Sequence, residues 1–280
     1  MRTHSDGQVT RTRRRRSLLS LAALLALVAR PVVAQQISVD ELELRLLVPR
    51  ASHLDPAAQT FRVTNPGSSA TRVTISAQDW DRDEKGTNRF YDLNALPTSC
   101  GARVHIFPAV LQLAPKSVQT VRVSVDSIDK ISRGCYAILF VESPPMPGSD
   151  KGVGISYSLR YGVKVYVERD LPLAAEIEDA EIARNDSAVA KGDTTAREVV
   201  LAFHNTGGRQ ATAHGTLEIR RPDNSLAGKV EIPDFPTLPG ATRRLDVPIP
   251  RLPRGKYVLL ALLDYGGTEI AAAQVELDRR

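Results

Sequence analysis

The sequence is poor in cysteine and in aromatic residues, and it contains no short catalytic motif. Of its 280 residues two are cysteine and one is tryptophan, and aromatic residues make up 5%. None of the five histidines has a partner at metal-ligand spacing, and neither a nucleophile elbow nor a phosphate-binding loop occurs. The sequence therefore predicts a protein that is not an enzyme, has no metal site and needs no cofactor.

Long apolar runs are also scarce, and the most pronounced one covers residues 18–29. It has about 12 residues, whereas a membrane-spanning helix needs roughly 20. An arginine-rich segment precedes it and the small residues Val32 and Ala34 follow, a pattern typical of a secretory signal peptide. We therefore expect residues 1–34 to be a cleaved signal peptide for export to the periplasm, with no stable insertion in the membrane.

This segment also carries most of the positive charge. The whole chain has a formal net charge of +5, and residues 1–34 hold seven arginines and one aspartate. Without them the net charge is close to −1, so the basic character belongs to the export segment. A nucleic-acid partner and a basic membrane-binding patch are therefore not expected.

The two cysteines, Cys100 and Cys135, occur in a chain that we expect to leave the reducing cytoplasm. Such an environment favours a disulfide bond between them. Closing this loop of about 35 residues would contribute on the order of 3 to 4 kcal/mol to stability. The alternative of two buried free thiols remains open at this point.

An acidic segment is only partly similar to a calcium-binding loop. Residues 79–88 read DWDRDEKGTN, with aspartates at the i, i+2 and i+4 spacing that such loops use. The glycine and the glutamate required at the sixth and twelfth positions are replaced by Glu84 and Phe90. We therefore predict a polar β-hairpin with Gly86 at its tip.

After residue 34 short alternating apolar runs are separated by Pro, Gly, Asn and Asp, and no helical period persists for three turns. This pattern predicts an all-β protein. The longest run is GISYSLRYGVKVYV (154–167), whose apolar residues recur with a period of two over more than twice the usual strand length of about 5 to 6 residues. We expect Tyr161 to Val167 to close a sandwich, and the residues before them to extend beyond it.

Three pairs of similar segments occur in the same order in the two halves of the chain. They are 61–77 with 201–219, 113–125 with 238–249, and 134–141 with 255–265. The repeat predicts two immunoglobulin-like β-sandwich domains, residues 35–169 and 170–280. Charges and a proline at 168–172 indicate a short linker between them, and a short linker favours a cleft between the domains.

Five segments of the first half carry a more specific likeness. They are LRLLVP (44–49), FRVTNP (61–66), AQDWDRDEKG (77–86), IFPAVLQLAPKSVQTVRV (106–123) and ISYSLRYGVKVYV (155–167). In this order they resemble the strands of the periplasmic chaperones of chaperone–usher pilus assembly, which are two-domain immunoglobulin-like proteins. The second half resembles that family only as a general immunoglobulin-like sandwich.

The resemblance implies two sets of client-binding residues. It places Arg45 and Lys164 in the interdomain cleft, where two cations grip the C-terminal carboxylate of a pilus subunit by charge-assisted hydrogen bonds. It makes Ile155, Tyr157 and Leu159 the alternating residues that fill the groove of a subunit lacking its last strand. From the residues alone, solvated cations and packing in the domain's own core remain the alternatives.

The function that this resemblance implies is that of an exported molecular chaperone. It would bind and stabilise pilus or fimbrial subunits by donor-strand complementation and deliver them for assembly. Pilus-like subunits are then the expected partners, and whether an outer-membrane usher also takes part remains open. The competing hypothesis is a structural or adhesive two-domain sandwich that binds an envelope protein or a polysaccharide and lends no strand.

Overall fold

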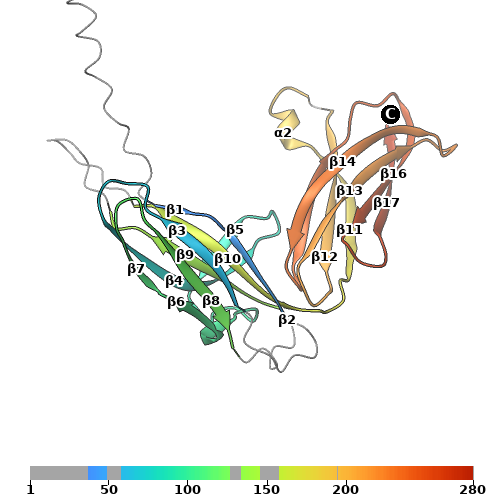
Figure 1. Cartoon of the computed structure of the whole chain (residues 1–280). Coiled ribbons are helices and arrows are strands. Elements are labelled where there is room, and N and C mark those ends of the chain that lie inside the picture. The colour runs from blue at the N-terminus through green and yellow to red at the C-terminus, as the bar shows by residue number, and fades with distance from the viewer. Residues whose placement is uncertain (1–36, 49–57, 127–133, 146–157, 194, 280) are drawn as a thin grey trace, which may run out of the picture.

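The structure, a computed structural model, describes residues 37–48, 58–126, 134–145, 158–193 and 195–279. Most of these residues lie in β-strands that form two sandwiches. The sandwiches are set at an angle and meet where the chain passes from β10 (Arg160–Arg169) to β11 (Ala175–Arg184) (Figure 1). The predicted all-β class with two β-sandwich domains is confirmed.

The first sandwich consists of two sheets. One has the order β1 (Ser38–Val39), β3 (Ala58–Thr64), β8 (Val118–Val125) and β6 (Val104–Phe107). The other has the order β2 (Glu43–Val48), β10, β9 (Cys135–Glu142), β4 (Thr71–Arg82) and β5 (Asn88–Tyr91), and β7 (Val110–Leu113) also pairs with β4. The β2–β10 pair is parallel, whereas the other strand pairs of this sandwich are antiparallel.

The second sandwich also consists of two sheets, and all of its strand pairs are antiparallel. One sheet has the order β11, β12 (Arg197–Asn205) and β15 (Thr242–Pro248). The other has the order β14 (Leu226–Thr237), β13 (Ala211–Arg220), β16 (Gly255–Asp264) and β17 (Ala271–Arg279). A one-turn helix, α2 (Asp186–Val189), follows β11.

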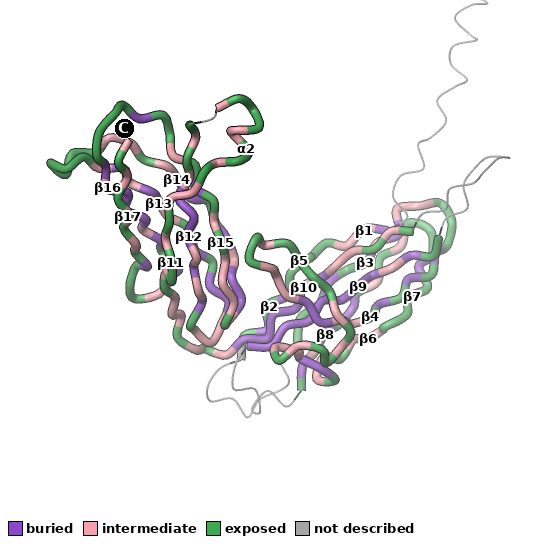
Figure 2. The backbone as a smooth tube through the Cα atoms, turned by 180° about the vertical axis from the view of Figure 1, so that it is seen from behind, coloured by how far each residue is buried: buried purple, intermediate pink, exposed green. Residues whose placement is uncertain are grey.

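Each sandwich has its own core, as the two-domain prediction requires. Along β10 every second residue, Val163, Val165 and Val167, is buried in the first core, so this part of the predicted long strand closes the sandwich as expected. The buried stretches run along the strands of each sandwich (Figure 2). Strand β9 is buried on both faces, which indicates a second apolar layer outside the first core.

The internal repeat of the sequence corresponds to a repeated turn. Asn65 and Asn205 are both buried, and each side-chain oxygen accepts a 2.9 Å hydrogen bond from the glycine two residues later, Gly67 or Gly207. Each side-chain amide donates to two or three carbonyl groups of the surrounding loops. These asparagines satisfy buried backbone groups that would otherwise lack partners, so they stabilise the same turn in both sandwiches.

The strand pairing repeats as well. The pairs β3–β8, β4–β9 and β9–β10 of the first sandwich correspond in sequence order to β12–β15, β13–β16 and β16–β17 of the second. The similar segments identified in the sequence therefore form equivalent strands of two related sandwiches.

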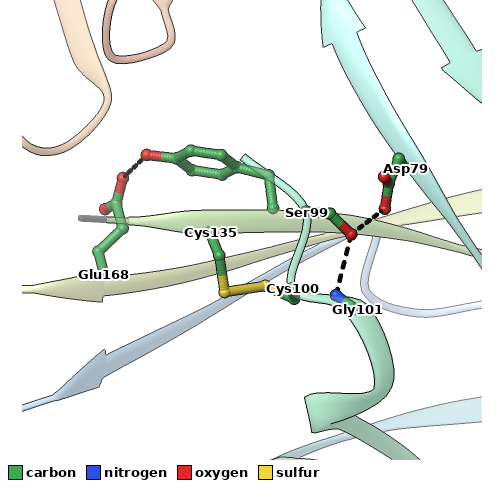
Figure 3. The surroundings of a disulfide bond; sticks show 7 residues. Asp79, Ser99, Cys100, Gly101, Cys135 and Glu168 are labelled. Carbon is green, nitrogen blue, oxygen red and sulfur yellow. Dashed lines mark hydrogen bonds between the residues drawn. A yellow bond between two sulfur atoms is a disulfide. The ribbon is translucent and has the colours of Figure 1, made fainter. Parts of the chain in front are cut away.

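The predicted disulfide bond between Cys100 and Cys135 is present (Figure 3). It joins the loop after β5 to the start of β9. The same loop is fixed by the buried carboxylate of Asp79, which accepts hydrogen bonds from the Ser99 hydroxyl at 2.6 Å and the Leu96 amide at 3.0 Å. These contacts hold the start of β9 in place beside the junction of the two sandwiches.

Strand β10 ends at Arg169, the last residue of the predicted first domain, so the first two residues of the predicted linker, 168–172, still belong to the strand. Glu168 is 4% exposed, and it accepts hydrogen bonds from Tyr136 in the first sandwich and from the Gln210 backbone amide in the second. Sequence spacing does not reveal these partners.

Candidate functional site

The candidate site lies on the outer face of the sheet that contains β10. Because side chains alternate along a strand, Lys164, Tyr166 and Glu168 point away from the core that holds Val163 and Val165. The parallel register places Glu43 beside Lys164 and Arg45 beside Tyr166. Two neighbouring strands therefore present alternating charged and aromatic side chains on one face.

A layer of aromatic side chains covers this face. Trp80, Tyr136 and Tyr166 are fully buried, and the Tyr166 ring lies edge-to-face with the other two at centroid distances of 5.6 and 5.8 Å. Leu238 and Ala241 of the second sandwich pack into the same cluster. The second sandwich therefore covers the aromatic layer at this end, and the charged residues lie around an apolar contact between the domains.

Arg45 lies at the boundary between the two sandwiches. Its guanidinium is 4.4 Å from the centroid of the Tyr166 ring and 3.4 Å from a carboxylate oxygen of Glu43. It also donates to the side-chain oxygen of Gln210 in the second sandwich at 3.5 Å, and it lies 3.9 Å from Glu168. The side chain is 43% exposed, so the guanidinium is accessible to a ligand.

Lys164 is partly buried and lies over the tryptophan ring. Its ammonium is 5.0 Å from the centroid of Trp80, and it has no hydrogen bond or ion pair among the described residues. Burial lowers the pKa of Lys164, the Arg82 charge lowers it further and Glu43 opposes the shift. A partly desolvated ammonium without an anion is stabilised by any carboxylate that reaches it.

Arg82 adds a third cation to this region. Its guanidinium lies 5.4 Å from the centroid of Trp80 and donates to the Asn88 side chain at 3.1 Å. It also donates to the carbonyl of Pro236 in the second sandwich at 3.5 Å. The junction thus gathers three cations around the aromatic layer.

Glu168 connects the two sandwiches. One of its carboxylate oxygens accepts a hydrogen bond from the Tyr136 hydroxyl at 3.2 Å, drawn at Glu168 in Figure 3. The same oxygen accepts a hydrogen bond from the backbone amide of Gln210 at 2.8 Å. Burial raises the pKa of Tyr136 above its usual value, and the Glu168 charge raises it further, so the hydroxyl remains a donor. A backbone bond from Gly134 to the carbonyl of Gly208, at 3.1 Å, adds to this contact.

The predicted polar hairpin is present and reaches the second sandwich. It joins β4 to β5, and Gly86 has the positive φ of 84° that its tip requires. The carbonyl of Glu84 accepts hydrogen bonds from the Arg243 side chain at 2.5 Å and the Arg244 amide at 2.8 Å. The hairpin therefore acts as a second contact that fixes the angle between the domains.

A cavity of about 600 Å³ lies beside this hairpin. Residues 81–85, 89 and 96–98 of the first sandwich and 238–242 of the second line it. Arg82 belongs to its wall, whereas Arg45 and Lys164 are not among the described residues that line it.

The structure brings two of the predicted site residues together. Arg45 and Lys164 lie on the same face of neighbouring strands, at the end of the first sandwich that contacts the second. Leu159 is partly buried and pairs with Ser143, whose backbone amide donates to the Leu159 carbonyl at 3.1 Å. Ile155 and Tyr157 lie outside the described residues.

Sequence reasoning missed the partners of Arg45, which are Glu43, Tyr166, Glu168 and Gln210. One signal was available, because Tyr166 is an aromatic residue at a position of β10 that the alternation assigns to the outer face. An aromatic at such a position indicates that the outer face is packed as well.

Among the described residues no helix is long and apolar enough to cross a membrane. The same residues contain no group of three or more His, Cys, Asp or Glu side chains that could hold a metal ion.

The fold, two immunoglobulin-like β-sandwiches, is similar to that of solved fimbrial chaperones. The crystal structure of the class 5 fimbriae chaperone CfaA aligns with a TM-score of 0.50 and 10% identity, over 86% of this chain and 98% of that chain. A chaperone–tip adhesin complex of CFA/I fimbriae biogenesis aligns with the same TM-score, the same identity and the same coverage of both chains. At this identity the likeness establishes the fold.

A further alignment is with the CsuC–CsuE chaperone–tip adhesion subunit complex of the Csu pili of Acinetobacter baumannii, with a TM-score of 0.47 and 10% identity. It covers 86% of this chain and 98% of that chain. No protein-family model and no curated protein sequence matches this chain.

Proposed function

We propose that this protein is a periplasmic chaperone of pilus assembly, which binds pilus-like subunits, completes them with its own edge strand and delivers them for assembly. The outer edge of β10 at residues 160–163 carries the proposal. Pairing with β2 begins at Lys164, and among the described strands none pairs with residues 160–163 on the side away from β9. Unpaired backbone groups at such an edge can pair with a strand of another chain.

The side-chain pattern at this edge supports the same proposal. Tyr161 and Val163 face the core of the first sandwich, and Leu159 precedes Tyr161 by two residues, the spacing of side chains on one face of a strand. Ile155 and Tyr157 continue this alternation in the sequence. An apolar row of this kind would fill the groove of a subunit that lacks its last strand, while the backbone completes its sheet.

The two cations at the junction support a carboxylate anchor. Lys164 has a partly buried ammonium without an acceptor among the described residues, and Arg45 has an accessible guanidinium. A chain-end carboxylate would form charge-assisted hydrogen bonds with both. Partial shielding by the second sandwich would make these bonds stronger than in open water. The binding of a chain needs no catalytic residue, so we propose a role without enzymatic activity.

The test is the capture of a client by a variant that lacks the apolar row. The tagged protein is recovered from its own periplasm, and the chains bound to it are identified by mass spectrometry. An incomplete sandwich lacking its last strand is the expected client, and it is then co-expressed with the triple variant Ile155→Ala, Tyr157→Ala, Leu159→Ala. We expect the variant to be folded and to lose at least nine tenths of the captured client.

A matched control replaces three apolar residues that are exposed elsewhere, Val118, Leu226 and Ile270, by alanine. This variant should capture the client as well as the wild-type protein does. Undiminished capture by the 155, 157, 159 variant would contradict the lending of a strand and favour the adhesive sandwich. Normal recovery of the complex with Lys164→Glu would contradict the carboxylate anchor.

A further inference from the structure

Glu43 occupies a central position among the cations of the candidate site. The parallel register places it directly beside Lys164, and it precedes Arg45 by two residues on the same face of β2. Glu43 therefore lies on the same face as both proposed anchor cations, and its carboxylate contacts one of them, Arg45.

Both carboxylate oxygens of Glu43 are bound. One lies 3.4 Å from the Arg45 guanidinium, and the other accepts a hydrogen bond from the Tyr166 hydroxyl at 3.4 Å. Burial raises the pKa of Tyr166, and Glu43 raises it further, so this hydroxyl remains protonated as a donor. A cation and a hydroxyl donor are also the groups that an incoming chain-end carboxylate needs.

The contacts of Glu43 are weak enough to be exchanged. Both distances are at the long end of the hydrogen-bond range, and the Glu43 side chain is 47% exposed. Exposed pairs of this kind contribute little to stability. Glu168 differs, since its side chain is 5% exposed and it accepts a 2.8 Å hydrogen bond from the Gln210 amide. One carboxylate is fixed at the junction, and the other is held loosely beside it.

We propose that Glu43 holds the place of the client carboxylate in the empty protein and is displaced when a client chain end binds, so that it sets the affinity of the site. This inference rests on the proposed function. While Glu43 occupies the Arg45 guanidinium and the Tyr166 hydroxyl, only the fraction of molecules in which it has moved away can bind a client, and the apparent affinity falls by that fraction. Its attraction for Lys164, which opposes the lowering of the Lys164 pKa by burial, agrees with this role.

The single tryptophan of the chain provides the measurement, because Lys164 and Arg82 both lie over the Trp80 ring. Its emission is followed while the full protein is titrated with N-acetyl-trialanine that has a free carboxylate, and in parallel with the C-terminal amide of the same peptide. Glu43→Gln keeps the shape of the side chain and removes its charge. We expect this variant to bind the acid about two- to fivefold more tightly than the wild-type protein, the range that a weak exposed pair allows.

The control is Glu41→Gln, which removes the same charge from an exposed position just before β2. It should change the dissociation constant of the acid by less than the Glu43 variant does. Equal effects of the two variants would show that only net charge matters, and would overturn the role of Glu43. So would unchanged or weaker binding by Glu43→Gln, confirmed with Glu43→Ala.

The proposed anchor is tested separately by the wild-type titrations and by Lys164→Gln. Weaker binding of the acid by Lys164→Gln, together with no effect of Glu43→Gln, would leave the anchor standing and reject the inference. Equal binding of acid and amide by the wild-type protein would overturn the anchor itself, and with it the role of Glu43.

Discussion

The last strands of the two sandwiches, β10 and β17, occupy equivalent places but have different neighbours. Strand β17 pairs with β16 and is the last strand in the order of its sheet. Strand β10 pairs with β9 on one side and, from Lys164 onward, in parallel with β2 on the other. The added strand β2 brings Glu43 and Arg45 to β10, so the same place in the fold becomes the end of a sheet in one domain and a charged site in the other.

The equivalent tyrosines of the two domains differ in the same way. The Tyr257 hydroxyl donates to the Pro253 carbonyl at 3.0 Å, a local bond that closes a corner of its own sandwich. The Tyr136 hydroxyl instead donates to Glu168 at the junction. A group that stabilises one domain internally is used in the other to connect the two domains.

The largest expected difference between the domains comes from the disulfide bond, which lies in the first sandwich. Cys100→Ser combined with Cys135→Ser should lower the free energy of unfolding of that sandwich by about 3 to 4 kcal/mol, because the unfolded chain regains the freedom of a loop of 35 residues. Hydrogen exchange measured by mass spectrometry reports on each sandwich separately and checks this value.

The second sandwich serves as the internal control for this experiment. The amides of its inner strands β13 and β16 should exchange at the same rate in the variant as in the wild-type protein. An equal loss of protection in both sandwiches would mean that they unfold as one unit, and the domains would then not differ in the way that their separate cores indicate.

The buried asparagines should have equal effects, because their turns are equivalent. Asn65→Ala and Asn205→Ala each remove donors to carbonyl groups of the turn and the acceptor of a glycine amide, and each should destabilise its own sandwich by about 2 to 3 kcal/mol. The same exchange measurement gives both values. A loss of stability in only one of the two variants would contradict the structural equivalence of the two turns.

Much of the fold could be predicted from the sequence, because it depends on local patterns. Alternation along 161–167 identified the residues that close the first core, and the repeat with Asn65 and Asn205 identified two related sandwiches. The sequence did not reveal that Glu168 is buried, because the backbone amide that it binds, that of Gln210, lies in the other domain. Local patterns do not contain the contacts that one domain makes with another.

The candidate site could be predicted only in part for the same reason. The resemblance identified Arg45 and Lys164, and the structure brings both to the junction. Glu43 was missed because its position beside Lys164 arises from the parallel pairing of β2 with β10, two strands more than a hundred residues apart in the chain. The register between these two strands cannot be predicted from the periodicity or the spacing of residues in the sequence.

The smallest expected effects come from removing the hydroxyl groups of the two equivalent tyrosines, Tyr257 and Tyr136. Tyr257→Phe removes a local hydrogen bond and should lower the free energy of unfolding of the second sandwich by about 1 kcal/mol, without affecting the junction.

Tyr136→Phe removes one donor from Glu168, so the backbone amide of Gln210, which donates to the same oxygen, should exchange faster. Because burial and then Glu168 raise the pKa of Tyr136 above its ordinary value of 10.0, its hydroxyl stays protonated at neutral pH. After correction for intrinsic exchange, the difference in the exchange rate of the Gln210 amide between Tyr136→Phe and the wild-type protein should therefore be constant from about pH 6 to pH 9. Faster exchange of the Gln210 amide in Tyr257→Phe as well would show that the two tyrosines do not have separate roles.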